Sequence, residues 1–291
     1  MTVATTGLYS LHLQNKKKLY IRNIVLAVLL IVFALITLFP IFYMITSSFG
    51  PALDSVSAAR SIFPSKWTFD SYTEFFNFSE NSLKWILNSL VVAASAVAGN
   101  VIFASMAGYG FSKINFKGRK WLFYLVLVGM MIPYQVTQVP LYILIVNKFK
   151  LSNTYTALIL PGLVTSYNIF LSKQFFTGIP TSLIESAKIE GCNQLQIFFK
   201  IVIPLSKTIL SVMAINTFLG NWNTFFWPFL TTKTSDMFTI QVGLQTFKTA
   251  NSTLFSPMMA GATISALPMF ILFFALQKYF LEGVTVGAVK G

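Results

Sequence analysis

Ionisable and metal-binding side chains are scarce in this chain of 291 residues. Charged residues make up 10% of the sequence, which contains one histidine, His12, and one cysteine, Cys192. A lone histidine ahead of the apolar stretches allows no histidine-based catalytic group among them. A lone cysteine with no histidine beside it indicates neither a metal site nor a disulfide within the chain. We therefore expect no catalytic residue, no metal ligand and no cofactor bound by this chain.

The sequence also lacks the features by which a protein draws energy from nucleotides or ion gradients. It has no glycine-rich loop ending in Gly-Lys-Ser or Gly-Lys-Thr, which would hold nucleotide phosphates. The centre of each long apolar stretch is free of Asp, Glu, Lys, Arg and His, the side chains that carry protons and ions through membranes. If the protein moves a solute uphill, the energy must come from another subunit. A secondary transporter is the alternative, and a membrane-embedded hydrolase is disfavoured because serines occur there without a base.

Apolar residues dominate what is present. They form 55% of the chain, and its mean hydropathy of +0.70 lies far outside the range of soluble proteins. A helix needs about 20 apolar residues to cross a hydrocarbon core of about 30 Å. Six stretches approach or exceed this length, at residues 24–45, 85–111, 121–144, 155–171, 208–229 and 258–277. The sequence therefore predicts an all-α integral membrane protein with six transmembrane helices.

Lysine and arginine are unevenly distributed among the predicted loops, and this predicts the orientation because basic residues favour the cytoplasmic side. With the N-terminus inside, the inner segments hold fourteen of the 21 basic residues, and the outer segments hold five of the eight acidic residues. We thus expect cytoplasmic tails at residues 1–23 and 282–291 and a six-span domain at residues 24–281. The net charge of +13 then reflects topology and not nucleic-acid binding, and the lysines at 16–18 are placed to contact membrane lipid.

One loop carries the signals of a folded unit: residues 180–204, between the fourth and fifth apolar stretches. Ser182 and Asn193 are each followed three residues later by Glu or Gln, which is the pattern of a capping box at a helix start. Gly191 lies between them, where a chain leaving a helix needs positive φ. The pattern predicts a cytoplasmic hairpin of two short helices, suited to docking. The alternative is a loop in which the acidic side chains only aid solubility.

Uncharged polar residues enter the apolar stretches and are candidates for a solute path, because such groups in a membrane turn toward partners or water. Helix–helix hydrogen bonding is the alternative for each. Pro133 and Pro140 are expected to kink the third stretch near Gln135 and Gln138. The rings and amides of residues 221–228 suit a sugar, whose C–H faces stack on rings while amides bind its hydroxyls; an interfacial aromatic belt is the alternative. The candidate path residues are Asn88, Gln135, Gln138, Asn216, Asn221, Trp222 and Asn223.

The hairpin resembles a motif of permease subunits from binding-protein-dependent ABC importers, which reads Glu-Ala-Ala, three residues, then Gly. This chain departs from the motif by Ser186, Glu190 and Cys192 in place of the usual Ala, Asp and Ala, and these changes keep side-chain size or charge. The resemblance implies that the first short helix seats in a cytoplasmic ATPase and carries its motion to the spans. The coupling residues it implies are Glu185, Ser186, Ala187, Glu190, Gly191 and Cys192.

Further likeness points to the maltose-type carbohydrate permeases, specifically the smaller of their two paired subunits. Four parts of the sequence are similar to that group: the C-terminal segment 279–291, the tripeptide Asn88-Ser89-Leu90, the dipeptide Trp222-Asn223 and the run 131–142. The resemblance implies uptake of a sugar or oligosaccharide by alternating access, with a heterodimer of this chain and a second permease. It also implies two ATPase copies that bind ATP and Mg, an extracytoplasmic sugar-binding protein, and a multi-pass location in a bacterial-type cytoplasmic membrane. Gly287 and Lys290 would lie near the ATPase. The runner-up is such a permease for a peptide, an amino acid or phosphate.

Overall fold

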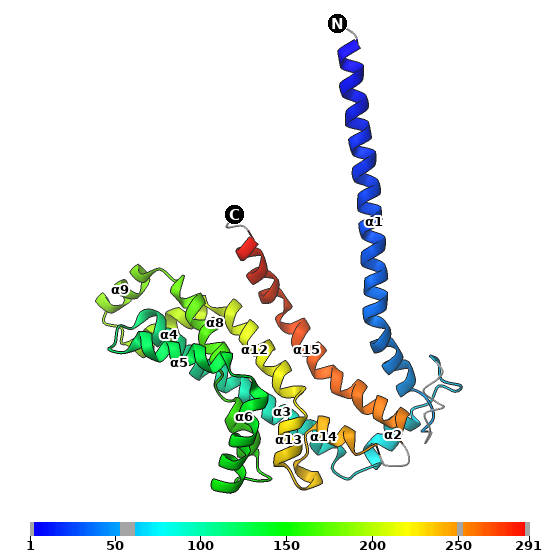
Figure 1. Cartoon of the computed structure of the whole chain (residues 1–291), viewed down its shortest axis with the longest axis vertical. Coiled ribbons are helices and arrows are strands. Elements are labelled where there is room, and N and C mark those ends of the chain that lie inside the picture. Colours follow the sequence, from blue (N-terminus) through cyan, green and yellow to red (C-terminus); the bar gives the residue numbers. More distant parts are fainter. Residues whose placement is uncertain (1–2, 53–61, 249–252, 289–291) are drawn as a thin grey trace. The chain divides into compact units, whose positions relative to one another are not determined.

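The computed structural model describes residues 3–52, 62–248 and 253–288, with side chains for 19–52, 62–248 and 253–278. These residues are almost entirely helical (Figure 1). They contain no strand, and one isolated antiparallel bridge joins Lys248 to Thr253. The chain divides into two compact units, one of residues 1–72 and 254–263 and the other of residues 73–253 and 264–291. The expectation of an all-α protein is confirmed.

The first unit is built on α1 (Val3–Ser48), whose apolar portion Leu19–Ser48 is 30 residues long with a mean hydropathy of 3.1. Most of the described side chains on this portion are exposed, which suits a helix surrounded by lipid because lipid tails solvate them. Beyond the helix end, Phe49 packs its ring against those of Phe69 and Tyr72. This contact folds the segment after α1 back toward the end of the helix.

The second unit is organised around two helix pairs. One long stretch, Ser82–Lys113, contains α3 (Ser82–Gly99), the π-helical turn η2 (Asn100–Ala104) and α4 (Ser105–Lys113). Within this unit α3 packs against α12 (Lys207–Trp222) and α4 packs against α8 (Ser166–Thr177). The hydroxyl of Ser172 on α8 donates to the carbonyl of Ala104 at 3.0 Å. Small side chains at this contact let the two backbones approach closely, as in many membrane proteins.

The other helical segments are shorter, except α15, which has residues in both units. Their bounds are α2 (Asp70–Asn77), α5 (Arg119–Met131), α6 (Tyr134–Tyr142), η3 (Ile143–Lys148), α7 (Tyr155–Ile159), η4 (Leu160–Gly162), α9 (Thr181–Ile189), α10 (Gln194–Ile197), η5 (Phe198–Val202), α11 (Ile203–Leu205), α13 (Phe226–Thr231), η6 (Ser235–Met237), α14 (Ile240–Gln245) and α15 (Phe255–Ala288).

Three described helices are long and apolar enough to cross a membrane without interruption: Leu19–Ser48, Ser82–Lys113 and Phe255–Lys278. They cover the first, second and sixth of the predicted stretches. The other candidate spans are pairs of helices that bend sharply at a short break, and the total reaches six only if each pair is one span. These pairs are Arg119–Met131 with Tyr134–Lys148, bent by 97°, Tyr155–Gly162 with Ser166–Thr177, bent by 40°, and Gln194–Leu205 with Lys207–Trp222, bent by 83°.

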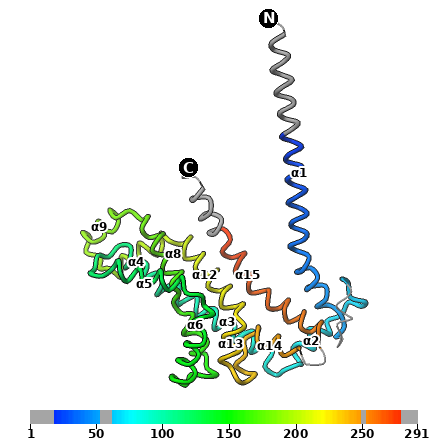
Figure 2. Tube along the Cα trace, viewed as in Figure 1, coloured from blue at the N-terminus to red at the C-terminus, as the bar shows by residue number. Residues whose placement is uncertain are grey.

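The third predicted stretch is interrupted more strongly than a proline kink. The chain turns by 97° between α5 and α6, which the trace in Figure 2 follows. Ile132 is extended there, with φ −77° and ψ 121°, because a residue before proline is driven out of the helical region. Pro133 then precedes the first residue of α6, whereas Pro140 lies inside α6 without ending it. A bend was expected near Gln135 and Gln138, but it lies at Ile132 and Pro133, ahead of both residues.

The fifth predicted stretch is also shorter as a helix than expected. α12 ends at Trp222, and the chain resumes helical structure only at Phe226 in α13. Between them the hydroxyl of Thr224 donates to the carbonyl of Gly220, and its amide donates to the carbonyl of Asn221. Such local bonds compete with the helical pattern, so the polar composition of this segment ends the helix before the predicted boundary at residue 229.

Candidate functional site

The hairpin of residues 180–204 contains a well-formed helix end. The amide of Cys192 donates to the carbonyl of Ala187 at 2.9 Å, and the amide of Gly191 donates to the carbonyl of Lys188 at 3.0 Å. These two bonds constitute a Schellman motif at the end of α9. Gly191 has φ of 83°, in the left-handed region that glycine adopts without a steric penalty. The predicted turn at Gly191 is confirmed.

The two predicted capping boxes have different outcomes. The box at α10 is confirmed, since the Asn193 side chain accepts from the Gln196 amide at 2.9 Å and the Gln196 side chain accepts from the Asn193 amide at 2.8 Å. The box at Ser182 is wrong. α9 begins at Thr181 with Pro180 as its N-cap and no side-chain cap, so Ser182 lies inside the first turn. Proline restricts φ to values compatible with a helix start, and with Pro180 as N-cap in place of Ser182 the boundary is displaced by two residues.

The hairpin is attached to the rest of the second unit by a hydrophobic core and by polar bonds. Ile184 and Ala187 of α9 are buried in one cluster with Phe176 and Phe198. The hydroxyl of Tyr109 on α4 donates to Gln194 Oε1 at 2.7 Å. The ammonium of Lys113 donates to the carbonyls of Thr177 and Ile179 at the end of α8. The hairpin is therefore a folded extension of α4 and α8, beyond whose ends Figure 1 shows α9.

The opposite face of the hairpin is exposed and mixes acidic with apolar side chains. Glu185, Ser186 and Glu190 are exposed, whereas Ala187 is 5% exposed and Cys192 is half-buried. Ile189 is 87% exposed, the highest value for a large apolar side chain among the described residues. Leucines at 183 and 195 add to this surface. An exposed apolar group with a charged rim is what a protein-docking surface requires.

The predicted path residues are not all alike in their surroundings. Asn88 is 2% exposed, and its amide donates to the carbonyls of Asp236 and Phe238 at 2.8 and 2.9 Å. Trp222 is 1% exposed and donates its indole N–H to the carbonyl of Ser265 at 3.0 Å. For Asn88 the packing alternative describes what the structure contains, and Trp222 is buried against α15. Their polar groups already have protein partners.

Other predicted path residues line, or lie beside, two hollows in the second unit. Asn216 and Asn221 lie on α12 and line one hollow of about 210 Å³, and Asn221 also lines a second of about 210 Å³. Gln138 is buried, and its side chain hydrogen-bonds that of Tyr134, which lines the second hollow. Gln135 and Asn223 are exposed and line neither hollow. The structure thus brings three of the seven candidates to one region of the second unit.

A buried polar network beside these hollows was not predicted as a functional element. Asn100, fully buried in η2, donates to the carbonyls of Ala96 and Gly162 at 2.9 and 2.7 Å. Its Oδ1 accepts from the Thr165 amide and from Asn168 Nδ2, both at 2.9 Å. It therefore fixes the break between η4 and α8. Its position inside an apolar stretch was the only sequence signal, because its partners other than Ala96 are more than 60 positions away.

The remaining candidates are the two C-terminal residues, Gly287 and Lys290, and any side chains that could bind a metal ion. Lys290 lies outside the described residues, and Gly287 falls near the end of α15. Among the residues that the structure describes, no group of three or more His, Cys, Asp or Glu side chains could hold a metal ion. The exposed hairpin and the uncharged hollows are thus the two features from which a function can be argued.

Long apolar helices, breaks lined by uncharged polar groups, and a folded hairpin with an exposed face define a class of protein, the helical integral membrane permease. The chain belongs to the family of the binding-protein-dependent transport system inner membrane component, whose match spans residues 100–286. Permease subunits of this family are generally non-catalytic.

Several relatives are similar over nearly the whole chain. The arabinooligosaccharides transport system permease protein AraQ of Bacillus subtilis (strain 168) is 36% identical over 281 residues, covering 96% of this chain and all of that protein. The galactooligosaccharides transport system permease protein GanQ of the same organism is 34% identical over 283 residues, covering 95% and 98%. A crystal structure of a bacterial ABC transporter involved in the import of the acidic polysaccharide alginate matches with a TM-score of 0.78 and 25% identity, covering 90% of this chain and 97% of that chain.

Proposed function

We propose that this chain is one permease subunit of an ATP-driven importer that takes up an oligosaccharide delivered by an extracytoplasmic binding protein. The hairpin is the observation that carries the proposal. Its Schellman turn and buried face hold a rigid shape, while Glu185, Ser186 and Glu190 remain exposed for a partner. The names of the relatives, which transport arabino- and galactooligosaccharides, support a saccharide as the solute.

The proposed assembly supplies what this chain lacks. A second, related permease completes the solute path, and two copies of a cytoplasmic ATPase bind ATP and Mg and receive the hairpin. The ATPase-coupling residues are Glu185, Ser186, Ala187, Glu190, Gly191 and Cys192, with Gly287 and Lys290 as further contacts. In this proposal six spans occupy residues 24–281, both tails are cytoplasmic, and the membrane is the cytoplasmic membrane of a bacterium. The distribution of basic residues supports this orientation.

The fold suggests how movement at the hairpin reaches the path. The segment Gln194–Leu205 leads directly into α12, and the two meet at a bend of 83° at Ser206. α12 carries Asn216 and Asn221 to the hollows. When the ATPase dimer closes on ATP, the hairpin moves as one body, since its core joins α9 to the ends of α4 and α8. α12 is then reoriented, the path opens toward the binding protein, and hydrolysis resets it. This is alternating access driven from outside the membrane.

The decisive experiment reconstitutes the assembly in proteoliposomes and measures uptake of a labelled arabino- or galactooligosaccharide. Uptake is expected to require ATP and to persist when the membrane potential is collapsed. Uptake that follows the potential with nucleotide depleted would instead indicate a secondary transporter.

Charge reversal tests the role of the hairpin in the same assay. Glu185→Lys is expected to leave insertion intact and to uncouple ATP turnover from uptake. Glu80→Lys is the matched control, because Glu80 is also exposed but lies far from the hairpin in the sequence. Normal uptake by Glu185→Lys, or equal loss in the control, would contradict the role of the hairpin.

A further inference from the structure

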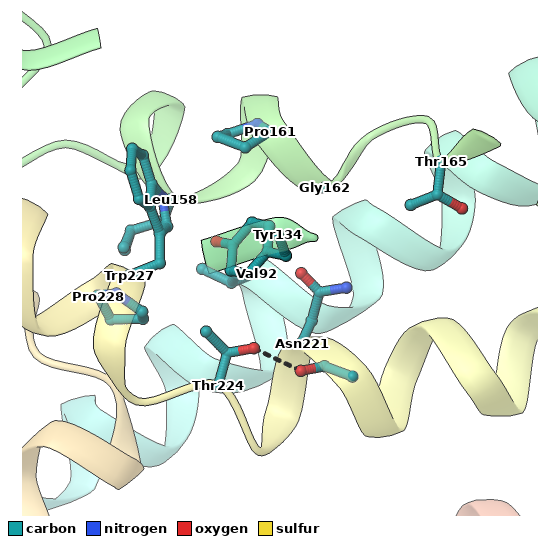
Figure 3. A pocket seen from close by; sticks show the side chains of 11 residues that line it. Val92, Tyr134, Leu158, Pro161, Gly162, Thr165, Asn221, Thr224, Trp227 and Pro228 are labelled. Carbon is teal, nitrogen blue, oxygen red and sulfur yellow. Dashed lines mark hydrogen bonds between the residues drawn. The ribbon is translucent and has the colours of Figure 1, made fainter. Parts of the chain in front are cut away.

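Three helix breaks of the second unit meet at one hollow (Figure 3). Tyr134 follows the break between α5 and α6, Thr165 follows the break between η4 and α8, and Thr224 lies between α12 and α13. Irregular backbone is tolerated at membrane depth where it is buried in protein or lines a cavity. Binding sites of many transporters lie at such discontinuous helices. The convergence of three breaks on one hollow therefore points to a site and not to a packing defect.

Three polar side chains of this hollow have oxygen atoms that can still accept hydrogen bonds. Asn221 Nδ2 donates to the carbonyl of Thr217 at 2.9 Å, which leaves its Oδ1 free to accept. In Figure 3 this oxygen lies on the side of the amide nearer Tyr134. The hydroxyl of Thr224 donates to the carbonyl of Gly220, so its lone pairs are available. The hydroxyl of Thr165 donates to Asn100 Oδ1 at 3.1 Å and accepts the Asn168 amide at 3.3 Å, which leaves it one further lone pair. A ligand that supplies several O–H donors fits this arrangement.

Glycine at position 162 keeps the acceptor in place. A Cβ at Gly162 would lie 2.8 Å from Asn221 Oδ1, closer than real Cβ atoms lie to other atoms. Any side chain there would displace the amide. The opposite wall is rigid and apolar, formed by Leu158, Pro161, Trp227 and Pro228. The indole N–H of Trp227 is already bonded to the carbonyl of Ala157 at 3.0 Å, so this residue offers only its apolar surface.

The adjoining hollow continues the same chemistry. It shares Thr165, Gly220 and Asn221 with the first and adds Asn168, whose buried Oδ1 has no hydrogen-bond partner among the described residues. None of the residues that line either hollow is charged. A carboxylate placed here would meet no cation, and a charge without a counter-charge is costly away from water. The hollows thus suit neutral hydroxyl-rich ligands and oppose acidic ones.

We propose that the first hollow is a subsite for one neutral sugar ring of the transported saccharide, bound by Asn221, Thr224 and Thr165 and selecting against uronic acids. The proposal rests on the proposed import of an oligosaccharide and narrows its substrate class. The volume of about 210 Å³ is below the roughly 300–1,000 Å³ of pockets that enclose a drug-sized ligand, so it accommodates one ring and not a chain. This subunit then contributes specificity beyond that of the binding protein.

Removal of one hydroxyl tests the subsite. Thr224→Val keeps the shape and deletes the acceptor, and its matched control is Thr232→Val, because Thr232 makes the same bond to the carbonyl four residues earlier but lines neither hollow. In the reconstituted importer Thr224→Val is expected to lower uptake of the neutral oligosaccharide about three- to tenfold, the effect of one lost hydrogen bond. The control is expected to retain wild-type uptake. Equal uptake in both variants overturns the subsite while leaving the importer function intact, whereas failure of the wild-type assembly overturns that function.

A labelling experiment tests selectivity without the binding protein. Thr224→Cys is made in a Cys192→Ala background, and the rate of its reaction with a maleimide is measured with the permease pair in detergent. Galactose or arabinose is expected to slow the reaction in a saturable way, and galacturonate at the same concentration is not. A Lys233→Cys variant, at an exposed position away from the hollow, is the control and is expected to respond to neither sugar. No protection, or equal protection by galacturonate, contradicts the proposal.

Discussion

Two small residues of the hairpin have complementary tasks. Ala187 is 5% exposed and accepts the amide of Cys192, so a larger side chain would push α9 away from the core that holds it. Gly191 turns the chain with φ of 83° so that Cys192 can reach back. The spacing of four between Ala187 and Gly191 is therefore a geometric requirement of the helix end, and the exposed glutamates are held in position by it.

Replacement of Gly191 by proline should break this helix end. Proline fixes φ near −65° and has no amide hydrogen, so the positive φ and the bond to Lys188 are both lost, at a cost of about 3 kcal/mol or more. We expect Gly191→Pro to insert in the membrane but to lower ATP-dependent uptake by about tenfold or more. Gly110→Ala is the control, because a Cβ at Gly110 meets no atom within 4 Å. Wild-type transport by Gly191→Pro would show that the hairpin turn is not used.

Asn100 is the residue whose loss should cost the most stability in the second unit. Asn100→Leu would leave the Gly162 carbonyl and the Thr165 amide without this buried partner, each worth about 1–3 kcal/mol. We expect a clear fall in the thermal unfolding midpoint in detergent. Asn115→Leu is the control, since Asn115 is exposed and accepts one bond from Arg119 at 2.9 Å. An unchanged midpoint for Asn100→Leu would mean that the network does not hold the break.

For single residues, the sequence predicts interactions between neighbours in the chain and misses contacts between residues far apart in the chain. The turn at Gly191 and the cap at Asn193 follow from residues within a few positions, and both are present. The cap at Ser182 is wrong because Pro180 is the N-cap, so the helix begins two residues earlier than predicted. The role of Asn100 depends on Gly162 and Thr165, which tertiary packing alone brings to it. The same holds for the hollow, because its lining comes from separate helices.

Among the elements, the hairpin helices depend on α4 for their position. α10 is the first turn of the helical segment Gln194–Leu205, and it is held by its cap and by the bond from Tyr109 to Gln194 at 2.7 Å. The core beneath it includes Ile197 and Phe198. The hairpin can thus act as a rigid lever only while this attachment persists.

Removal of the Tyr109 hydroxyl should loosen the lever. Tyr109→Phe deletes one hydrogen bond, worth about 1 kcal/mol, and keeps the ring in the core. We expect about fivefold faster hydrogen exchange at residues 193–198, measured by mass spectrometry. Tyr124→Phe, on an exposed tyrosine of α5, is the control. If exchange in the hairpin is equal in both variants, the hydroxyl does not secure α10.

Helix content was easier to predict than helix continuity. Uninterrupted helices cover the first, second and sixth apolar stretches, because composition sets their length. The other stretches contain breaks whose angles, 97° and 83° among them, depend on packing as well as on proline. The polar turn at Asn221 and Thr224 ends α12 early, although both residues lie in the segment 221–228, whose rings and amides were recognised in the sequence. Apolar length is thus a poor guide to where a helix ends when polar side chains bond to the backbone.

For the whole molecule, the proposal assigns each loop to one side of the membrane from the distribution of basic residues. This topology can be tested with introduced cysteines. The native thiol, Cys192, is replaced by alanine, and a single cysteine is then introduced at Ser182 or at Lys233, both exposed. The hairpin and the segment after α13 should lie on opposite sides, because four predicted inner segments carry most of the basic residues. A membrane-impermeant maleimide added to intact cells is expected to label Lys233→Cys and not Ser182→Cys.

Inside-out vesicles provide the reciprocal measurement, in which Ser182→Cys is labelled and Lys233→Cys is not. A detergent-solubilised sample, where both cysteines should react, shows that each thiol is reactive when accessible. Labelling of Ser182→Cys from outside would place the hairpin on the face of the membrane where no cytoplasmic ATPase can reach it. In that case the coupling role of Glu185 and Gly191 would fail together with the predicted topology, even if uptake of an oligosaccharide were still observed.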